Sequence, residues 1–424
     1  MNPLLRILYH FLKTIVRISL RIFYRHTVVE GRELLAVTGP AIVVSNHPST
    51  LMDPFNAVAR VKRIVFFLAN ASLFKHPVVD RILSTLYCIK IERYSDTGGK
   101  PLQNEEAFAQ CREFLQKGGC LYVAPEGTSE AERKLRRIKT GTARIALSAE
   151  AANGFELGIK ILPVGLNYSD PRYFRADIQV RAGEHIRVSD FREIFERDPW
   201  EAVERLTEAI HAALSRLIVD ASDDEEEAEL SVLEDLAQTE TPLPFAQTVD
   251  RSQELLRRWR RFDGAKEPVQ TYGRSLREHG LSDRVVAGWK PGPGFRLSLL
   301  AGALPAVYGY LNHLLPCGLP ALIDRKFNRW PCYEATYKYV SGLVLAPLFY
   351  FLQIKLVAAL TDLELWYAIS LPFTGFFADW YGRRWALWRE ARRLAKLAVN
   401  RADQFNELKS SRLSAETCLK TLHV

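Results

Sequence analysis

Residues 43–54 read Val43-Val44-Ser45-Asn46-His47-Pro48-Ser49-Thr50-Leu51-Met52-Asp53-Pro54. The apolar residues that lead into this stretch follow Gly39-Pro40 and predict a buried strand over 41–45, which places His47 where a strand leaves a sheet. Ligands of α/β sheets bind at such strand ends. A histidine there can take a proton from a hydroxyl, and the carboxylate of Asp53 can hold its ring in one tautomer. The alternative is a surface loop whose polar residues only make turns.

Three later motifs accompany this stretch. They are Cys88-Ile89-Lys90-Ile91-Glu92-Arg93, Ala124-Pro125-Glu126-Gly127-Thr128 and Ile161-Leu162-Pro163-Val164. Together with His47 and Asp53 they resemble the glycerophospholipid acyltransferase family, the phosphate acyltransferase domain of bacterial lysophosphatidate acyltransferases, over about residues 30–220. Two features depart from the commonest family pattern: Asp53 lies six residues after His47 instead of five, and Cys88 stands where glycine is usual.

The resemblance implies an enzyme that moves a fatty acyl group from an acyl thioester, either acyl-CoA or acyl-carrier protein, to a hydroxyl of lysophosphatidate or glycerol 3-phosphate. It makes His47 the general base that removes the hydroxyl proton, and Asp53 the residue that orients the ring. The substrate's own oxygen is the nucleophile. The resemblance therefore implies neither a metal nor a bound cofactor, and the acyl thioester is a co-substrate.

The resemblance also implies the substrate-binding residues. Arg93 follows a predicted short strand, where its guanidinium can hold a phosphate with two hydrogen bonds, and Lys139 would assist it. Gly127 permits close approach of the backbone, while Glu126 can accept a hydrogen bond from a substrate hydroxyl or orient Arg93. With Thr128 these residues would form the pocket for the acceptor.

A basic run surrounds the predicted start of a helix at Thr140. It consists of Arg133, Lys134, Arg136, Arg137, Lys139 and Arg144. Helix N-termini and cations both favour anions, so a phosphate of the acceptor or of coenzyme A is one predicted ligand. A solvated run of charges explains the same residues.

Composition limits the classes of protein. The 424 residues are too many for one typical core, so we expect two domains. The net charge of +8 suits nucleic acid or an anionic membrane, and no zinc-ligand spacing or RNP-like motif supports a nucleic-acid partner. The six cysteines form no Cys-x-x-Cys pair, which indicates neither a disulfide framework nor a metal cluster and favours a reducing, cytoplasm-facing location.

Alternating strand and helix patterns predict an α/β acyltransferase domain over 28–219, with a mixed sheet flanked by helices. The predicted strands are 41–45, 64–69, 89–91, 121–123, 159–164 and 178–188. The predicted helices are 53–58, 78–87, 104–117, 140–152 and 200–219. Because the motif residues fall at strand ends or in the loops that follow, they can share one site.

Residues 1–27 predict an amphipathic helix that lies at a membrane interface. Lys13, Arg17, Arg21 and Arg25 recur at every fourth position and form a basic stripe, and apolar residues fill most of the remaining surface. The alternative is an ordinary amphipathic helix packed on the domain.

Beyond the domain, the acidic residues that begin at Asp220 predict a flexible linker over 220–250.

Residues 251–424 predict a helical, membrane-associated region. Residues 297–323 carry no formal charge and residues 339–378 carry few, and we predict an apolar hairpin for each because both runs exceed a single span of ~20 residues. Basic residues flank both runs and would all lie on the cytoplasmic side. The expected partner is therefore the lipid bilayer, with the catalytic domain facing the cytoplasm. The alternative is a soluble domain of buried helices.

A second functional hypothesis is a catalytically silent scaffold that keeps the fold and uses its cationic site to hold anionic lipid. The displaced Asp53 is the feature that favours this hypothesis. A hydrolase is a third, but the sequence contains no Gly-x-Ser-x-Gly nucleophile elbow.

Overall fold

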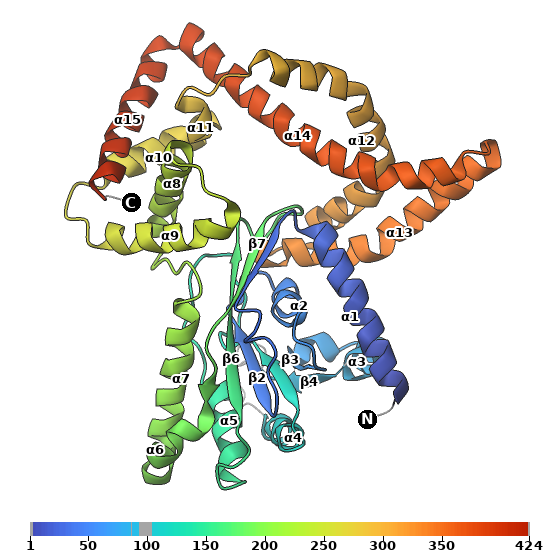
Figure 1. Ribbon diagram of the computed structural model, residues 1–424, viewed down its shortest axis with the longest axis vertical. Helices are drawn as coiled ribbons and strands as arrows, with labels where there is room; N and C mark the ends of the chain where they lie inside the picture. Colours follow the sequence, from blue (N-terminus) through green and yellow to red (C-terminus); the bar gives the residue numbers. More distant parts are fainter. Residues whose placement is uncertain (1–2, 86, 93–103, 423–424) are drawn as a thin grey trace. The chain divides into compact units, whose positions relative to one another are not determined.

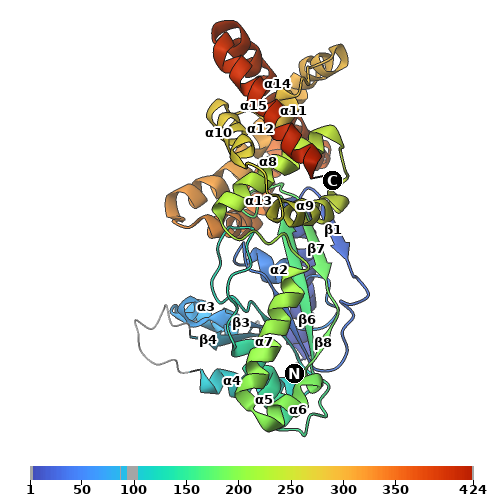
Figure 2. The same ribbon diagram turned by 90° about the vertical axis from the view of Figure 1, so that its left-hand side faces the viewer.

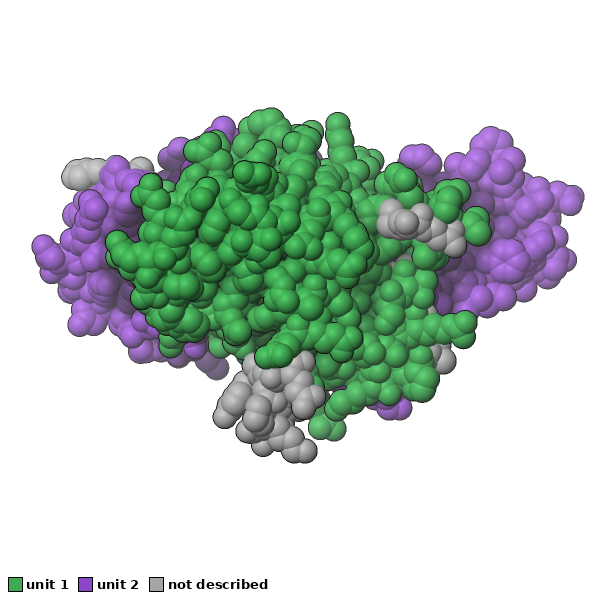
Figure 3. All heavy atoms as spheres, turned by 90° about the horizontal axis from the view of Figure 1, so that it is seen from below, with its two compact units in different colours: residues 1–220, 329–336 green, residues 221–328, 337–424 purple. Residues whose placement is uncertain are grey.

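The structure is a computed structural model that describes residues 3–85, 87–92 and 104–422. The chain divides into two compact units, which Figure 3 colours separately. Unit 1 contains residues 1–220 and, after a long excursion of the chain, residues 329–336. Unit 2 contains residues 221–328 and 337–424.

Unit 1 is organised around a mixed sheet, so the predicted α/β class is confirmed. Its described strands are β1 Thr27–Glu30, β2 Ala41–Ser45, β3 Phe66–Asn70, β4 Cys88–Ile91, β5 Cys120–Val123, β6 Lys160–Tyr168, β7 Ile178–Ala182 and β8 Ile186–Arg187. Their order is β1-β7-β6-β2-β5-β3-β4, and β8 pairs with β6. β7 and β8 run antiparallel to β6, and the other described pairs are parallel.

Two strand predictions need correction. One strand, β1, was not expected from its sequence; it is a four-residue edge strand that pairs with β7. The single strand expected over 178–188 is instead two strands, β7 and β8, separated by Gly183-Glu184-His185. Both segments pair with β6. The break between them was missed because an apolar pattern predicts burial but does not mark where a strand ends.

Helices cover both faces of the sheet (Figures 1 and 2). In unit 1 they are α1 Pro3–Phe23, α2 Met52–Val58, α3 Pro77–Thr85, α4 Glu105–Gln116, α5 Gly141–Ala151, α6 Arg192–Arg197 and α7 Pro199–Ser215. On one face α4, α5 and α7 contribute Leu115, Leu147 and Leu206 to a fully buried core that includes Ile42 and Leu121 of the sheet. On the other face α2 packs against β2 and β6.

The central strand β2 places the residues that follow it. All five of its residues are buried, and it pairs in parallel with β5 on one side and β6 on the other. A strand enclosed in this way is expected to be continuously apolar, as this one is up to Ser45. The amide of Asn46 then bonds both backbone groups of Leu166, at 2.8 and 3.0 Å. His47 therefore leaves the sheet from a fixed point.

Unit 2 is helical. Its helices are α8 Asp224–Glu240, α9 Phe245–Arg260, α10 Glu267–His279, α11 Asp283–Val286, α12 Pro293–Phe327, α13 Glu334–Leu360 from residue 337 onward, α14 Glu364–Asn400 and α15 Ala402–Thr421.

The flexible linker predicted over 220–250 is wrong, because α8 and the start of α9 occupy most of this range. Asp223 caps α8 by accepting a hydrogen bond from the Glu226 backbone N–H at 2.8 Å. The acidic residues fill the first turn, where the helix dipole favours negative charge. Leu230, Leu233 and Leu236 follow at helical spacing and are fully buried. The acidic run is thus the start of a packed helix.

The hairpin predicted for 297–323 is also wrong. These residues lie within α12, one continuous helix of 35 residues that contains Pro305, Pro316 and Pro320. Proline kinks a helix without reversing it, and Figure 1 shows α12 as a curved helix. Residues 339–378 differ, because α13 and α14 meet at residues 361–363 and the chain turns back there. Within unit 2, α14 packs against α12.

Candidate active site

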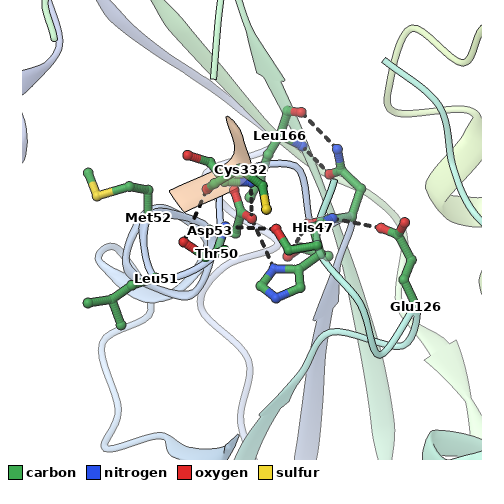
Figure 4. Close-up of polar contacts among 12 residues, drawn as sticks. His47, Thr50, Leu51, Met52, Asp53, Glu126, Leu166 and Cys332 are labelled. Carbon is green, nitrogen blue, oxygen red and sulfur yellow. Dashed lines mark hydrogen bonds and ion pairs between the residues drawn. The ribbon is translucent and has the colours of Figure 1, made fainter. Parts of the chain in front are cut away.

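His47 and Asp53 are in direct contact. The Nδ1 atom of His47 lies 2.9 Å from Oδ2 of Asp53 (Figure 4). Asp53 sits in the first turn of α2 and its side chain is fully buried, whereas the His47 side chain is 12% exposed. The other ring nitrogen, Nε2, forms no hydrogen bond to a described residue. This arrangement holds one ring nitrogen and leaves the other for a substrate proton.

The six-residue spacing does not separate the pair, because the loop turns tightly. The backbone N–H of Ser49 donates to the same Asp53 oxygen at 2.7 Å. Thr50 has a φ of 40°, a left-handed conformation that is uncommon for any residue other than glycine. The Ser49 hydroxyl donates to the Pro171 carbonyl at 2.7 Å. The turn therefore accommodates the extra residue and directs the carboxylate back to the ring.

Asp53 has a further partner. The hydroxyl of Tyr168, at the end of β6, donates to Oδ1 of Asp53 at 2.7 Å. Burial raises the pKa of Asp53, while the hydrogen bonds from His47, Ser49 and Tyr168 act in the opposite direction. Burial and the nearby carboxylate also raise the pKa of Tyr168 well above its ordinary value, so this phenol remains a donor. Three donors thus converge on one enclosed carboxyl group.

Glu126 supports the loop from the end of β5. Its Oε1 accepts the backbone N–H of His47 at 2.7 Å, and Oε2 accepts the backbone N–H of Arg136 at 3.2 Å. Burial raises its pKa to about 7, although both hydrogen bonds favour the ionised form. The carboxyl group therefore ties the histidine loop to the basic loop. Both oxygens already have backbone partners, which adds a structural role to the predicted contact with substrate.

The side chain of Lys139 lies against Gly127. Its backbone N–H donates to the Pro125 carbonyl at 2.8 Å, and a Cβ atom added to Gly127 would lie 2.9 Å from the lysine Nζ. Glycine suits this position because it has no Cβ to meet the lysine and because it tolerates the observed φ of 70°. Thr128 follows in the same loop and is half-buried. The loop after β5 therefore joins Glu126 to the backbone of His47 and places the Lys139 side chain against Gly127.

Some of the other residues predicted to bind phosphate are not shown beside His47. Arg93 lies outside the described residues, so its predicted contact with phosphate stays a prediction. Arg136 pairs with Glu132 at 2.9 Å. Thr140 is the N-cap residue of α5, but its side chain makes no capping hydrogen bond. In the described part of the chain, no group of three or more His, Cys, Asp or Glu side chains is placed to hold a metal ion.

Sequence reasoning missed two partners of the site. Tyr168 is one. The other is Thr336, whose hydroxyl lies 2.5 Å from that of Thr50 and accepts the Leu51 backbone N–H at 3.2 Å. Leu51 is the N-cap residue of α2 and supplies no capping side chain, and Thr336 satisfies the backbone N–H of Leu51 itself at the start of this helix. Cys332 is buried nearby, and its carbonyl accepts from the Thr50 hydroxyl at 3.3 Å (Figure 4).

Comparison with known proteins agrees with the acyltransferase resemblance that the sequence motifs indicate. Residues 26–167 match the family model named Acyltransferase. The predicted resemblance to the acyltransferase family is therefore confirmed for this part of the chain.

Several relatives of this chain are glycerolipid acyltransferases by name. The chain is 29% identical over 193 residues to glycerol-3-phosphate O-acyltransferase 2 of Saccharomyces cerevisiae, a match that covers 44% of this chain and 26% of that protein. It is 25% identical over 166 residues to a chloroplastic 1-acyl-sn-glycerol-3-phosphate acyltransferase of Arabidopsis thaliana, covering 39% and 42%. It is 31% identical over 172 residues to a putative 1-acyl-sn-glycerol-3-phosphate acyltransferase of Caenorhabditis elegans, covering 37% and 52%.

These matches span between about a quarter and about half of the length of the relatives. Among solved structures, the 1-acyl-sn-glycerophosphate acyltransferase PlsC from Thermotoga maritima matches with a TM-score of 0.32 and 23% identity, over 46% of this chain and 79% of that one. Superposition at this level is too loose to compare the two sites.

Proposed function

We propose that the protein is a membrane-bound glycerolipid O-acyltransferase, which transfers a fatty acyl group from acyl-CoA or acyl-carrier protein to a hydroxyl of lysophosphatidate or glycerol 3-phosphate. The observation that carries the proposal is the contact of 2.9 Å between His47 Nδ1 and Asp53 Oδ2 beside a family-matched β5 loop. The named relatives supply the two candidate acceptors.

In the proposed reaction, Nε2 of His47 takes the proton of the acceptor hydroxyl as its oxygen attacks the thioester carbonyl. The new C–O bond forms, the C–S bond breaks, and the proton passes to the departing thiolate. Asp53 holds the proton on Nδ1 and so keeps Nε2 free to act as the base. Neither a metal nor a cofactor takes part in this scheme.

The acceptor phosphate would bind on the side of His47 where the β5 loop lies. Lys139 provides a cation there, Gly127 and Thr128 provide close backbone, and Arg93 is the proposed bidentate partner. The basic run before α5 would hold either this phosphate or those of coenzyme A, as its charge and its position before a helix suggest.

Membrane attachment is supported by the exposure of α1. Leu4, Ile7, Phe11, Ile18 and Ile22 are between 50% and 73% exposed, whereas soluble amphipathic helices bury their apolar face. Among the described helices, one segment, Pro331–Leu360, is long and apolar enough to cross a membrane. We propose that α1 lies in the interface, that part of the helical region enters the bilayer, and that the catalytic side faces the cytoplasm.

The silent-scaffold hypothesis has lost its support. It depended on a displaced Asp53, and Asp53 contacts His47 directly. No other observation favours that function.

The proposal is tested by adding labelled acyl-CoA or acyl-carrier protein to vesicles containing the full chain, with glycerol 3-phosphate, lysophosphatidate and other lysophospholipids as acceptors. We expect a labelled phosphate-bearing glycerolipid from one acceptor. His47→Ala should abolish it, and His211→Ala, a change on α7, should not. Equal label transfer by wild-type protein and His47→Ala would refute the assignment of this site.

A further inference from the structure

Four arginines gather on the side of unit 1 where α1 meets α2. Arg17 and Arg21 belong to α1, Arg32 follows β1, and Arg60 follows the end of α2. Arg17, Arg21 and Arg60 line a small open cavity of about 30 Å³ together with the polar side chains of Thr27 and Asn56. Residues from three separate segments, α1, β1 with the loop after it, and α2 with the loop after it, thus contribute to one strongly cationic surface around this cavity.

The positive charges in this cluster lack compensation. None of the four guanidinium groups forms an ion pair or hydrogen bond with a described residue. Burial, together with the charges of Arg32, Arg17 and Arg21, lowers the pKa of Arg60 to about 10. Like charges in such proximity destabilise one another, so the cluster is at its most favourable with an anion between them.

Two other cations of the N-terminal basic stripe, Lys13 on α1 and Arg25 just after it, have partners within unit 1. The Lys13 ammonium donates to the carbonyls of Val61 and Arg63, and Nε of Arg25 donates to Asp177 at 2.8 Å. The basic stripe predicted to face the bilayer is therefore divided, because Lys13 and Arg25 fasten α1 to the domain. Arg17 and Arg21, which lie between them on the same stripe, remain for another partner.

Cavity size and position define that partner. The cavity of about 30 Å³ is too small for an acyl chain, and its cationic lining suits the oxygens of an anionic head group at its open mouth. Guanidinium groups bind phosphate oxygens through paired hydrogen bonds, and several of them suit a doubly charged phosphate. Ile18 and Ile22, which follow Arg17 and Arg21 directly, are 55% and 50% exposed. A ligand with a phosphoryl head and acyl chains would meet cationic and apolar surface together.

We infer that Arg17, Arg21, Arg32 and Arg60 form a binding site for the phosphomonoester headgroup of an anionic phospholipid, separate from the site around His47. Asn56 connects the two regions. Its amide donates to the Met52 carbonyl at 2.9 Å and to the Tyr168 hydroxyl at 3.4 Å, and Tyr168 holds Asp53. A lipid in the cavity would thus contact a residue that is two hydrogen bonds away from the catalytic carboxylate.

Arginine-specific labelling with phenylglyoxal, read residue by residue by mass spectrometry, tests this inference independently of acyl transfer. The full chain in detergent micelles is labelled with and without dihexanoyl phosphatidate. Arg60 should label readily because its pKa is lowered. Added phosphatidate should slow the labelling of Arg60 by at least about 5-fold, and Arg205, an exposed arginine on α7, serves as the internal control.

Variants and other probes separate the outcomes. In Arg17→Gln/Arg21→Gln, protection of Arg60 should need at least about 10-fold more phosphatidate. Both side chains are exposed, so the fold should tolerate these changes. Equal protection by dihexanoyl phosphatidylcholine would show that apolar coverage is responsible, and equal protection by inorganic phosphate would show a free-phosphate site. Either result, or no protection at all, would overturn the inference.

Discussion

Glu126→Gln is predicted to change how the stability of unit 1 depends on pH. The Glu126 carboxyl has a pKa of about 7 in the folded protein against an ordinary value of 4.5, chiefly because it is buried. The folded state therefore binds this proton more tightly than the unfolded chain does. The stability that results is complete below about pH 4.5 and is lost as the pH rises to about 7, by at most roughly 3 kcal/mol.

Glutamine at this position carries no charge to bury, so the pH-dependent loss should disappear. The variant still has one oxygen for either the His47 or the Arg136 backbone N–H, while its NH₂ group faces the other donor. That mismatch costs stability, but by the same amount at every pH. The signature is therefore the slope with pH and not the offset between the two proteins.

The measurement heats the full chain in detergent at several values between about pH 5 and about pH 8, and then cleaves it briefly with a protease. Peptides from β2 and β5 report the unfolding of unit 1. The midpoint difference between wild type and variant should change by up to roughly 6–12 °C across this range, since 1 kcal/mol shifts such a domain by about 2–4 °C. Glu130→Gln, in the same loop, is the control. Parallel curves for wild type and Glu126→Gln would show that Glu126 stays ionised and that our account of its burial is wrong.

Other changes test the catalytic geometry. His47→Ala should lower kcat by roughly 10²- to 10⁴-fold, because it removes the proposed general base. The amount of protein recovered in the membrane fraction should not change. Steady-state assays measure kcat, and fractionation measures the recovered protein. Tyr168→Phe deletes a hydrogen-bond donor to Asp53 that contributes about 1.5–3 kcal/mol, so the pKa of Asp53 should rise further. The acidic limb of the pH–rate profile should therefore move to higher pH. An unmoved limb would contradict the role given to this hydroxyl. Thr336→Val leaves the Leu51 N–H without its acceptor and should lower kcat with little change in KM, whereas Thr336→Ser should restore it; a loss that serine does not restore would point to packing instead.

The sequence predicted those parts of the site that are close together along the chain. The strand over 41–45, His47, Asp53 and the Glu126 loop could be placed because an apolar strand followed by polar residues has a local pattern. Tyr168 and Thr336 could not. They reach Asp53 and Leu51 across separations of 115 and 285 residues, which no periodicity reveals.

The helical region shows a different limit. Charge composition suggested a linker where α8 begins, because an acidic first turn and a disordered acidic run look alike until the buried leucines after it are considered. Proline likewise suggested a reversal within 297–323. A helix tolerates proline when its curvature accommodates the ring and the missing N–H, and α12 continues through three of them.

Residues 329–336 make unit 1 discontinuous along the chain. A gene fragment that stops at residue 220 would encode every described strand of the sheet but not Thr336, and the Leu51 N–H at the start of α2 would lose its acceptor. A chain that has emerged from the ribosome only as far as residue 220 cannot yet make the contacts of Thr50 and Leu51 with Cys332 and Thr336. The chain from α8 to α12 is synthesised before residues 329–336, so the last piece of the catalytic unit emerges directly before the apolar remainder of α13.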